Sequence, residues 1–316
     1  MHASRTRPLL ILGLALALAG AGCAWSGPRD GGSTPEQKTA AVEAAEAIQF
    51  IPGDTFEIRQ TVLGFGAFIP DLLQSMDGVR KVTIKRFAPT HVAELDWTLE
   101  TTRETESSKK LRAEYEAERQ RDPGTELPPP TVATERVTTE GRLVGINLRT
   151  SHTAFLPAYW PEGTHDMLGE KTGIWLSDDA FMELSKTNKT ILNLGVFDDA
   201  LNQAVKNVAE LKEALAVLRE QASQEEAYKD LTLLEAEAER IEWPLTVNGE
   251  KKIVSAIRAR NWFGEVIVLN SRQNPMILKV TLNPLAAGMD VAAGHGASVM
   301  DRLFGYEVNN VMLKRP

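Results

Sequence analysis

Cysteine and histidine are scarce in this sequence. The chain has 316 residues, with one cysteine and five histidines. A single thiol cannot form a disulfide within the chain, and it excludes the zinc sites that use several cysteines. We find no His-x-His pair and no HExxH motif, because the histidines stand apart at His2, His91, His152, His165 and His295. The sequence therefore predicts no metal ligands and no cofactor.

Positive charge is also in short supply. Lys and Arg number 35 against 43 Asp and Glu, which gives a net charge of −8 at pH 7. Binding of nucleic acid or of anionic membrane surfaces depends on concentrated Lys and Arg. An acidic chain is repelled by both, so the sequence predicts no nucleic-acid partner.

Motifs of catalysis and of nucleotide binding are missing. The stretch 294–298, GHGAS, has a serine near a histidine but lacks the final glycine of a nucleophile elbow. The stretch 63–70, LGFGAFIP, lacks the Gly-Lys-Ser/Thr ending of a phosphate loop and the third glycine of a dinucleotide fingerprint. We therefore predict no catalytic residues, and we favour a non-catalytic protein over an enzyme. The enzymatic alternative is a hydrolase with a dispersed site.

An apolar run does stand at the N-terminus. Two basic residues, Arg5 and Arg7, precede it, and small residues lead from Leu18 to Cys23. This order is typical of a secretory signal peptide. The uncharged stretch 8–23 is shorter than the roughly 20 residues that a membrane-spanning helix needs, so permanent spanning is disfavoured.

Gly20-Ala21-Gly22-Cys23 resembles the lipobox of bacterial lipoproteins, in which a small residue precedes an acylated cysteine. Gly22 fits that pattern, whereas Gly20 stands where the family usually has leucine. The resemblance implies cleavage before Cys23, lipidation of Cys23 (palmitate among its acyl chains) and a stable lipid anchor in the membrane. Ala24, where an aspartate would imply inner-membrane retention, favours the outer membrane facing the periplasm. The alternative for Cys23 is an ordinary thiol.

The expected organisation has three parts. Residues 1–22 are the signal peptide. Residues 23–48 hold the lipid anchor, a flexible tether and a short alanine-rich helix, and residues 49–316 form a β-rich periplasmic body. Cleavage removes Arg5 and Arg7 and no acidic residue, so the net charge changes from −8 to −10.

Alternation of apolar and polar residues with a period of two dominates the body, and it is typical of half-buried antiparallel strands. We expect strands at 54–62, 79–87 and 92–100, two strands within 136–149 joined around Glu140-Gly141, and further strands at 245–254, 265–269, 276–282 and 306–313. Asn248-Gly249 predicts a type I′ hairpin turn, because both residues accept positive φ. Ser177 is expected to cap a helix that begins at Asp178.

We expect an α+β fold, in which a curved antiparallel, half-barrel-like sheet carries helical insertions at about 106–122 and 197–242. The first insertion alternates acidic and basic residues, which favours a solvated helix over a partner-binding arm. The second has apolar residues at coiled-coil spacing from Leu201 to Leu218 and continues toward Ile241. It forms either a long helical hairpin, which we favour, or one coiled-coil rod.

The sequence VIVLNSRQNPMILKVTLNP, residues 266–284, resembles the closing hairpin of periplasmic proteins of unknown function. Their curved antiparallel sheet is similar to that of lipoprotein carriers of the envelope. The resemblance covers only these residues and adds support to the curved sheet.

Two apolar clusters interrupt the polar loops, and they supply the candidate ligand-binding residues. These are Phe65, Phe68, Ile69, Leu72, Tyr159 and Trp160. Apolar side chains in such number must cover the core, a ligand, a partner or a membrane surface. We favour a plug of the open end of the sheet over the mouth of a ligand pocket.

These observations predict a membrane-anchored bacterial envelope lipoprotein that acts as a non-catalytic binding or scaffold protein. Its lipid attaches it to the membrane, and its helices are the expected contact for an envelope protein partner. The alternative is a carrier of an apolar ligand or lipid under the curved sheet.

Overall fold

The computed structural model describes residues 34–62, 78–121, 128–157, 160–194, 232–261, 264–282 and 304–314. The chain divides into two compact units, Met1–Thr34 and Pro35–Pro316, and the elements below belong to the second. The expected signal peptide, Cys23 and the tether up to residue 33 lie outside the described residues. No helix within the described ranges is long and apolar enough to cross a membrane.

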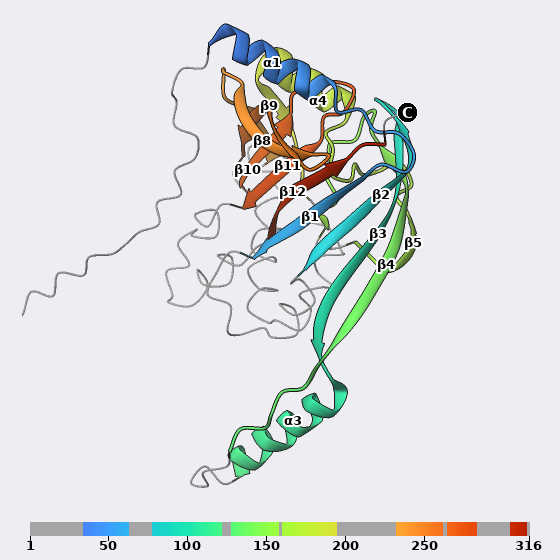
Figure 1. Cartoon of the computed structure of the whole chain (residues 1–316), viewed down its shortest axis with the longest axis vertical. Helices are drawn as coiled ribbons and strands as arrows, with labels where there is room; N and C mark the ends of the chain where they lie inside the picture. Colours follow the sequence, from blue (N-terminus) through green and yellow to red (C-terminus); the bar gives the residue numbers. More distant parts are fainter. Residues whose placement is uncertain are drawn as a thin grey trace, which may run out of the picture. The chain divides into compact units, whose positions relative to one another are not determined.

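Strands dominate the described residues (Figure 1). The helices are α1 (Pro35–Glu46), α3 (Glu106–Arg121) and α4 (Asp178–Thr187). The strands are β1 (Thr55–Val62), β2 (Val79–Ala88), β3 (Val92–Glu104), β4 (Thr134–Asn147), β5 (Gly163–Asp166), β6 (Lys189–Ile191), β7 (Leu233–Ala236), β8 (Ile241–Val247), β9 (Glu250–Arg260), β10 (Gly264–Leu269), β11 (Ile277–Leu282) and β12 (Phe304–Met312). They form one sheet in the order β5-β4-β3-β2-β1-β12-β11-β10-β9-β7-β6, and β8 pairs with both β9 and β12.

The five strands β8 to β12 close into a barrel. β8 is the closing strand, because it pairs antiparallel with β9 and meets β12 in parallel at Val247 and Val311. Beside that contact the Asn248 N–H donates to Val311 O at 2.8 Å, and Asn248 Oδ1 accepts from Leu313 N at 2.7 Å. Asn248 and Gly249 have φ of 52° and 80°, so the predicted type I′ turn is confirmed.

A second set of strands continues the sheet from β12. β1 pairs with β12, and β2, β3 and β4 follow in antiparallel pairs before the parallel strand β5. We call β1 to β5 the sheet extension. Its inward residues alternate with outward ones, as the period of two requires: Phe56 and Ile58 are buried on β1, and Val82 and Ile84 on β2.

An aromatic cluster and one buried amide connect the segment after α1 to the sheet. Phe50, Phe56 and Phe87 surround Trp175 with ring centroids 5.7–6.5 Å away. Asn274 is fully buried, accepts from Trp175 Nε1 at 2.8 Å and donates to Ile48 O at 2.9 Å. Buried polar groups are stable only when they are paired in this way, so Asn274 fixes the positions of three separate segments.

The helix α3 lies at the end of a long two-stranded hairpin (Figure 1). β2 pairs with β3 only as far as Leu99, whereas β3 and β4 remain paired to Glu104 and Thr134. Ser108 is the only buried residue of α3, and an ion pair joins Arg112 Nη2 to Glu104 Oε2 at 2.9 Å. The other residues of α3 are partly or fully exposed, as alternating charges require.

The expected α+β fold is wrong, because the described residues are mostly β and the sheet closes into a barrel instead of remaining a half-barrel. No long helical hairpin or coiled coil is present in the described ranges. The helix expected at 197–242 is contradicted at its C-terminal end by β7 and the start of β8. The spacing of Leu231, Leu234 and Ile241 fits a helix, but Leu234 is buried against the sheet while Glu235 faces Lys189 on β6. Residues 195–231 lie outside the described residues.

The cap expected at Ser177 is confirmed. Its hydroxyl oxygen accepts from Ala180 N at 3.2 Å, and Asp178 and Asp179 occupy the first turn of α4. These carboxylates interact favourably with the positive N-terminal end of the helix dipole.

Candidate functional site

Of the residues predicted to bind a ligand, the structure describes Trp160. Its side chain is 5% exposed, and its Nε1 donates to Phe155 O at 2.9 Å. The other candidates lie outside the described residues: Phe65, Phe68, Ile69, Leu72 and Tyr159. Their role, like the lipidation of Cys23, stays a prediction.

Trp160 lies against Arg80, a charged residue on the inward face of β2. The alternation of β2 turns Arg80 in the same direction as Val82 and Ile84, and only 3% of its surface is exposed. Its neighbours across the sheet are Ile58 on β1 and Leu99 on β3. An arginine in an apolar row is unusual, since a buried charge normally has a carboxylate partner.

Two indole rings flank the Arg80 guanidinium. Its Cζ lies 4.2 Å from the centroid of the Trp97 ring and 5.3 Å from that of Trp160. These distances are within the range of cation–π attraction, and arginine stacks on tryptophan more favourably than on other rings. Trp97 and Trp160 therefore stabilise a charge that the rest of the apolar face does not.

Gly141 makes room for this stack. It pairs with Trp97 across β3 and β4, and a Cβ at this position would lie 2.7 Å from the Trp97 ring and 2.6 Å from Pro161 O. A side chain here would force the ring or the segment at Pro161 to shift. The φ of Gly141 lies outside the left-handed region, so the backbone conformation does not require glycine. The close packing against Trp97 and Pro161 O does.

The hydrogen bonds of this group leave two donors without acceptors. Arg80 Nη1 donates to Pro157 O, which also accepts the Trp160 N–H at 3.3 Å. Arg80 Nε and Trp97 Nε1 are both buried and have no acceptor among the described residues. Such unpaired groups cost free energy, and in native proteins they call for an explanation.

Burial alone lowers the pKa of Arg80, to about 9. The guanidinium therefore remains protonated at pH 7, and its positive charge is retained inside the fold. Among the described residues, no charged group opposes the effect of burial and none forms an ion pair with Arg80. We call Arg80, Trp97, Trp160 and Pro157 the Arg80 site.

Other arginines of the chain show what is missing at Arg80. Arg142 binds Asp96 through Nε and Nη2 at 2.6 and 3.1 Å, and Arg272 binds Asp178 in the same way at 2.8 and 3.0 Å. This two-point geometry is the usual recognition of a carboxylate by arginine. In each pair the pKa of the carboxyl is lowered, chiefly by the arginine hydrogen bond. Arg80 has the same Nε edge, and no carboxylate of the described residues binds to it.

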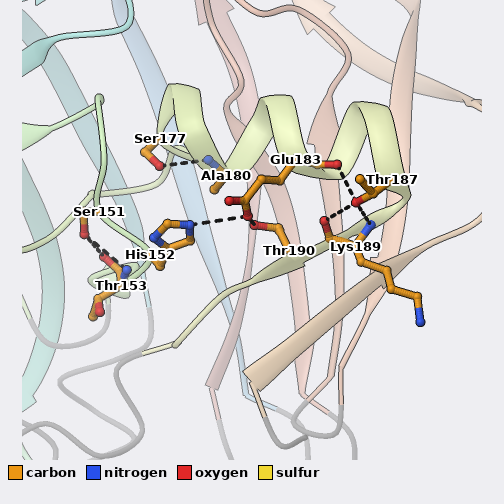
Figure 2. Close-up of polar contacts among 9 residues, drawn as sticks. All are labelled: Ser151, His152, Thr153, Ser177, Ala180, Glu183, Thr187, Lys189 and Thr190. Atoms are coloured by element: carbon orange, nitrogen blue, oxygen red, sulfur yellow. Dashed lines mark hydrogen bonds and ion pairs between the residues drawn. The ribbon is translucent and has the colours of Figure 1, made fainter. Parts of the chain in front are cut away.

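A second polar group lies beside α4, and in it His152 lies near the carboxylate of Glu183 (Figure 2). His152 Nε2 is 3.6 Å from Glu183 Oε2, which also accepts from Thr190 Oγ1 at 2.8 Å. The Ser151 hydroxyl donates to Glu170 O at 2.6 Å and accepts from Thr153 N, so it is not directed at the imidazole. This geometry holds a helix to a strand and does not form a nucleophile–base pair.

The other described histidines take part in turns and packing. His91 Nδ1 lies 2.9 Å from Pro89 O, and the ring of His165 packs against Phe155 at 6.0 Å. The carboxylate next to His165, Asp166, accepts from Leu168 N at 2.9 Å instead of pairing with the imidazole. Among the residues that the structure describes, no three His, Cys, Asp or Glu side chains are grouped as a metal site.

Sequence reasoning missed Arg80 and Trp97, although a signal for both was present. In Val79-Arg80-Lys81-Val82-Thr83-Ile84 the arginine has the parity of Val82 and Ile84. Trp97 likewise has the parity of Leu95 and Leu99, both of which are buried. The same alternation that predicted the strands therefore places both residues on the core face.

Comparisons of the chain with protein-family models, with curated proteins and with solved structures found no match.

Proposed function

We propose that this chain is a lipid-anchored protein of the bacterial envelope whose β body binds a ligand without catalysing a reaction. The observation that carries the binding function is Arg80, a buried charge held between Trp97 and Trp160 with no carboxylate partner among the described residues. Convergent polar groups on an otherwise apolar surface are the usual composition of a ligand site.

The proposed location depends on the N-terminal sequence. The basic start at Arg5 and Arg7, the apolar run and the lipobox-like Gly20-Ala21-Gly22-Cys23 support an acylated Cys23. Ala24 supports the outer membrane, with the body facing the periplasm. Two or three acyl chains are enough for stable attachment, because each buried methylene contributes about 0.8 kcal/mol of membrane affinity.

Binding is favoured over catalysis by the kind of groups that the described residues bring together. The Arg80 site offers N–H donors and aromatic faces, and these recognise a ligand but supply no nucleophile and no base. The polar group at His152 directs its serine away from the imidazole. A hydrolase would need groups beyond those described.

One observation supports a second function, that of a scaffold. α3 is carried beyond β2 by the β3–β4 hairpin, and Ser108 is its only buried residue (Figure 1). A helix presented in this way offers a surface with charges of both signs to an envelope protein partner. The acidic and basic side chains pair along the helix, as in Lys109–Glu106 at 3.0 Å and Arg121–Glu118 at 3.3 Å, which is also typical of a solvated arm.

Native mass spectrometry of the full chain purified from its own membranes tests the proposal. We expect a mass that corresponds to cleavage before Cys23 with acyl chains attached, and an additional mass that dissociates under activation as a bound ligand. The Cys23→Ser variant should lose the acyl mass and the label from a palmitate analogue, whereas Ser26→Ala, the matched control, should keep both. An acylated wild-type protein that never carries or takes up a ligand contradicts the binding function, and label that persists in Cys23→Ser contradicts the anchor.

A further inference from the structure

We propose that the Arg80 site binds the anionic head of an amphiphile, a carboxylate or phosphate group carried on an apolar chain, through the Nε edge of Arg80. This inference rests on the proposed binding function and deepens it by naming the class of ligand.

The unpaired groups at the site are all donors. Arg80 Nε and Trp97 Nε1 are buried without acceptors, and Arg80 is within 4.2 Å of the Trp97 ring centroid. Neither group can accept a hydrogen bond from a ligand, because guanidinium and indole nitrogens only donate. A ligand that satisfies them must bring acceptor atoms, which excludes an ammonium or a metal cation.

The charge of the site selects an anion among the possible acceptors. Arg80 is positively charged, and no carboxylate of the described residues neutralises it. Charge-assisted hydrogen bonds are about twice as strong as neutral ones, and a planar guanidinium fork matches carboxylate and phosphate oxygens. Arg142 and Arg272 show this fork already filled by Asp96 and Asp178.

The side chains next to Arg80 favour an anion that is carried on an apolar chain. Ile58 and Leu99 are the cross-strand neighbours of Arg80, and both are buried. The rings of Trp97 and Trp160 both lie within cation–π distance of the guanidinium, so the group next to the anion meets aliphatic and aromatic side chains. A small hydrated anion would lose its water there without apolar contacts in return.

Titrations with matched amphiphiles test this inference. The full chain in phosphatidylcholine nanodiscs, with empty nanodiscs as the blank, is titrated with octanoate, octyl phosphate and octanol by calorimetry and by tryptophan fluorescence. We expect the two anions to bind at least 10-fold more tightly than octanol and to change the emission of Trp97 and Trp160. Acetate and inorganic phosphate show whether the ligand needs an apolar chain. If both bind more weakly than octanoate and octyl phosphate, the ligand is an amphiphile. If they bind as tightly, the inference that the ligand carries an apolar chain is wrong.

Variants assign the effect to Arg80. Arg80→Met should reduce octanoate and octyl phosphate affinity by about 10- to 100-fold, since hydrogen bonds to charged groups contribute that much. Arg142→Gln removes an arginine from the outer face of β4 and should leave the affinity unchanged. A second measurement does not depend on a variant: octyl phosphate should raise the melting temperature of the wild-type chain, and octanol should not.

The outcomes separate this inference from the proposed function. Equal binding of octanol and octanoate, unaffected by Arg80→Met, overturns the anion site and leaves the binding function in place. Binding of none of the probes, together with no ligand retained in the protein from its own membranes, overturns both.

Discussion

The barrel and the sheet extension place different side chains on their inward faces. In the barrel, most of the fully buried residues are aliphatic, as with Ile257 on β9, Val268 on β10 and Leu278 on β11, and the buried Tyr306 on β12 stays uncharged because burial raises its pKa. In the extension, Arg80 is buried in a row of otherwise apolar residues on β2, whereas the buried Glu104 has the opposite parity to Trp97 on β3 and pairs with Arg112. Burial of an aliphatic side chain stabilises the fold, whereas burial of a charge destabilises it unless the charge is paired. The barrel is therefore built for stability, and the extension contains the residues that stability alone does not explain.

The largest expected effect comes from the barrel. Leu278→Ala removes a fully buried side chain and leaves a cavity, so we expect the free energy of unfolding to fall by about 2–5 kcal/mol. Ile253→Ala on β9, where the side chain is 49% exposed, is the control and should change it by less than about 0.5 kcal/mol. Urea denaturation of the three proteins measures both values. Equal effects of the two variants contradict the assignment of the stability to the barrel interior.

A smaller effect is expected where the extension packs Trp97 against β4. Gly141→Ala places a Cβ 2.7 Å from the Trp97 ring, and overpacking of this kind costs about 1–3 kcal/mol. Gly173→Ala is the matched control, because its Cβ would meet its nearest neighbours at 3.5 Å, an ordinary contact. Thermal melting compares the two. If Gly141→Ala melts like Gly173→Ala, Trp97 does not lie where the structure places it.

The smallest effect concerns the pH dependence of the ion pair between Asp178 and Arg272. The arginine hydrogen bond lowers the pKa of Asp178 in the folded state, so the unfolded state binds its proton first as the pH falls. The stabilising contribution is therefore present above the unfolded pKa of about 3.9 and is lost as the pH falls toward the lower folded pKa. Arg272→Gln should remove this part of the acid dependence, so stability should fall less between pH 7 and pH 3 in the variant than in the wild type. An unchanged difference between pH 7 and pH 3 would falsify the assignment.

Local patterns in the sequence predicted much of the fold. Alternation located the strands around Phe56, Val82 and Leu95, and Asn248-Gly249 located a hairpin, because these signals lie within a few residues of one another. Barrel closure depends on a contact between Val247 and Val311, which are far apart in sequence, so no local pattern contains it. The spacing that favours a helix up to Ile241 was overridden by the pairing of β7 with β6 and β9.

For the candidate site too, local patterns account for single residues, whereas the contacts between them depend on the tertiary fold. Alternation places Arg80 and Trp97 on the core face, and the apolar cluster around Trp160 was recognised as a ligand-binding candidate from its composition. The approach of Trp160 to Arg80 depends on a tertiary contact across about 80 residues of chain, seen also in the bond from Arg80 Nη1 to Pro157 O, whose sequence separation is 77. Sequence reasoning therefore identified Trp160 as a candidate but missed Arg80 and Trp97, because the contact that brings the three together is not local in sequence.

The stability of Arg80→Met, measured by urea denaturation beside its affinity for octyl phosphate, tests most directly whether Arg80 is kept for binding. Methionine fills a similar volume without a charge, and replacing a buried charge by an apolar side chain is often neutral or stabilising. We predict that the variant unfolds at the same urea concentration as the wild type or a higher one, while its affinity for octyl phosphate falls by about 10- to 100-fold. A variant that loses more than about 2 kcal/mol of stability, in the range of broken structural networks, and still binds octyl phosphate as the wild type does contradicts the account.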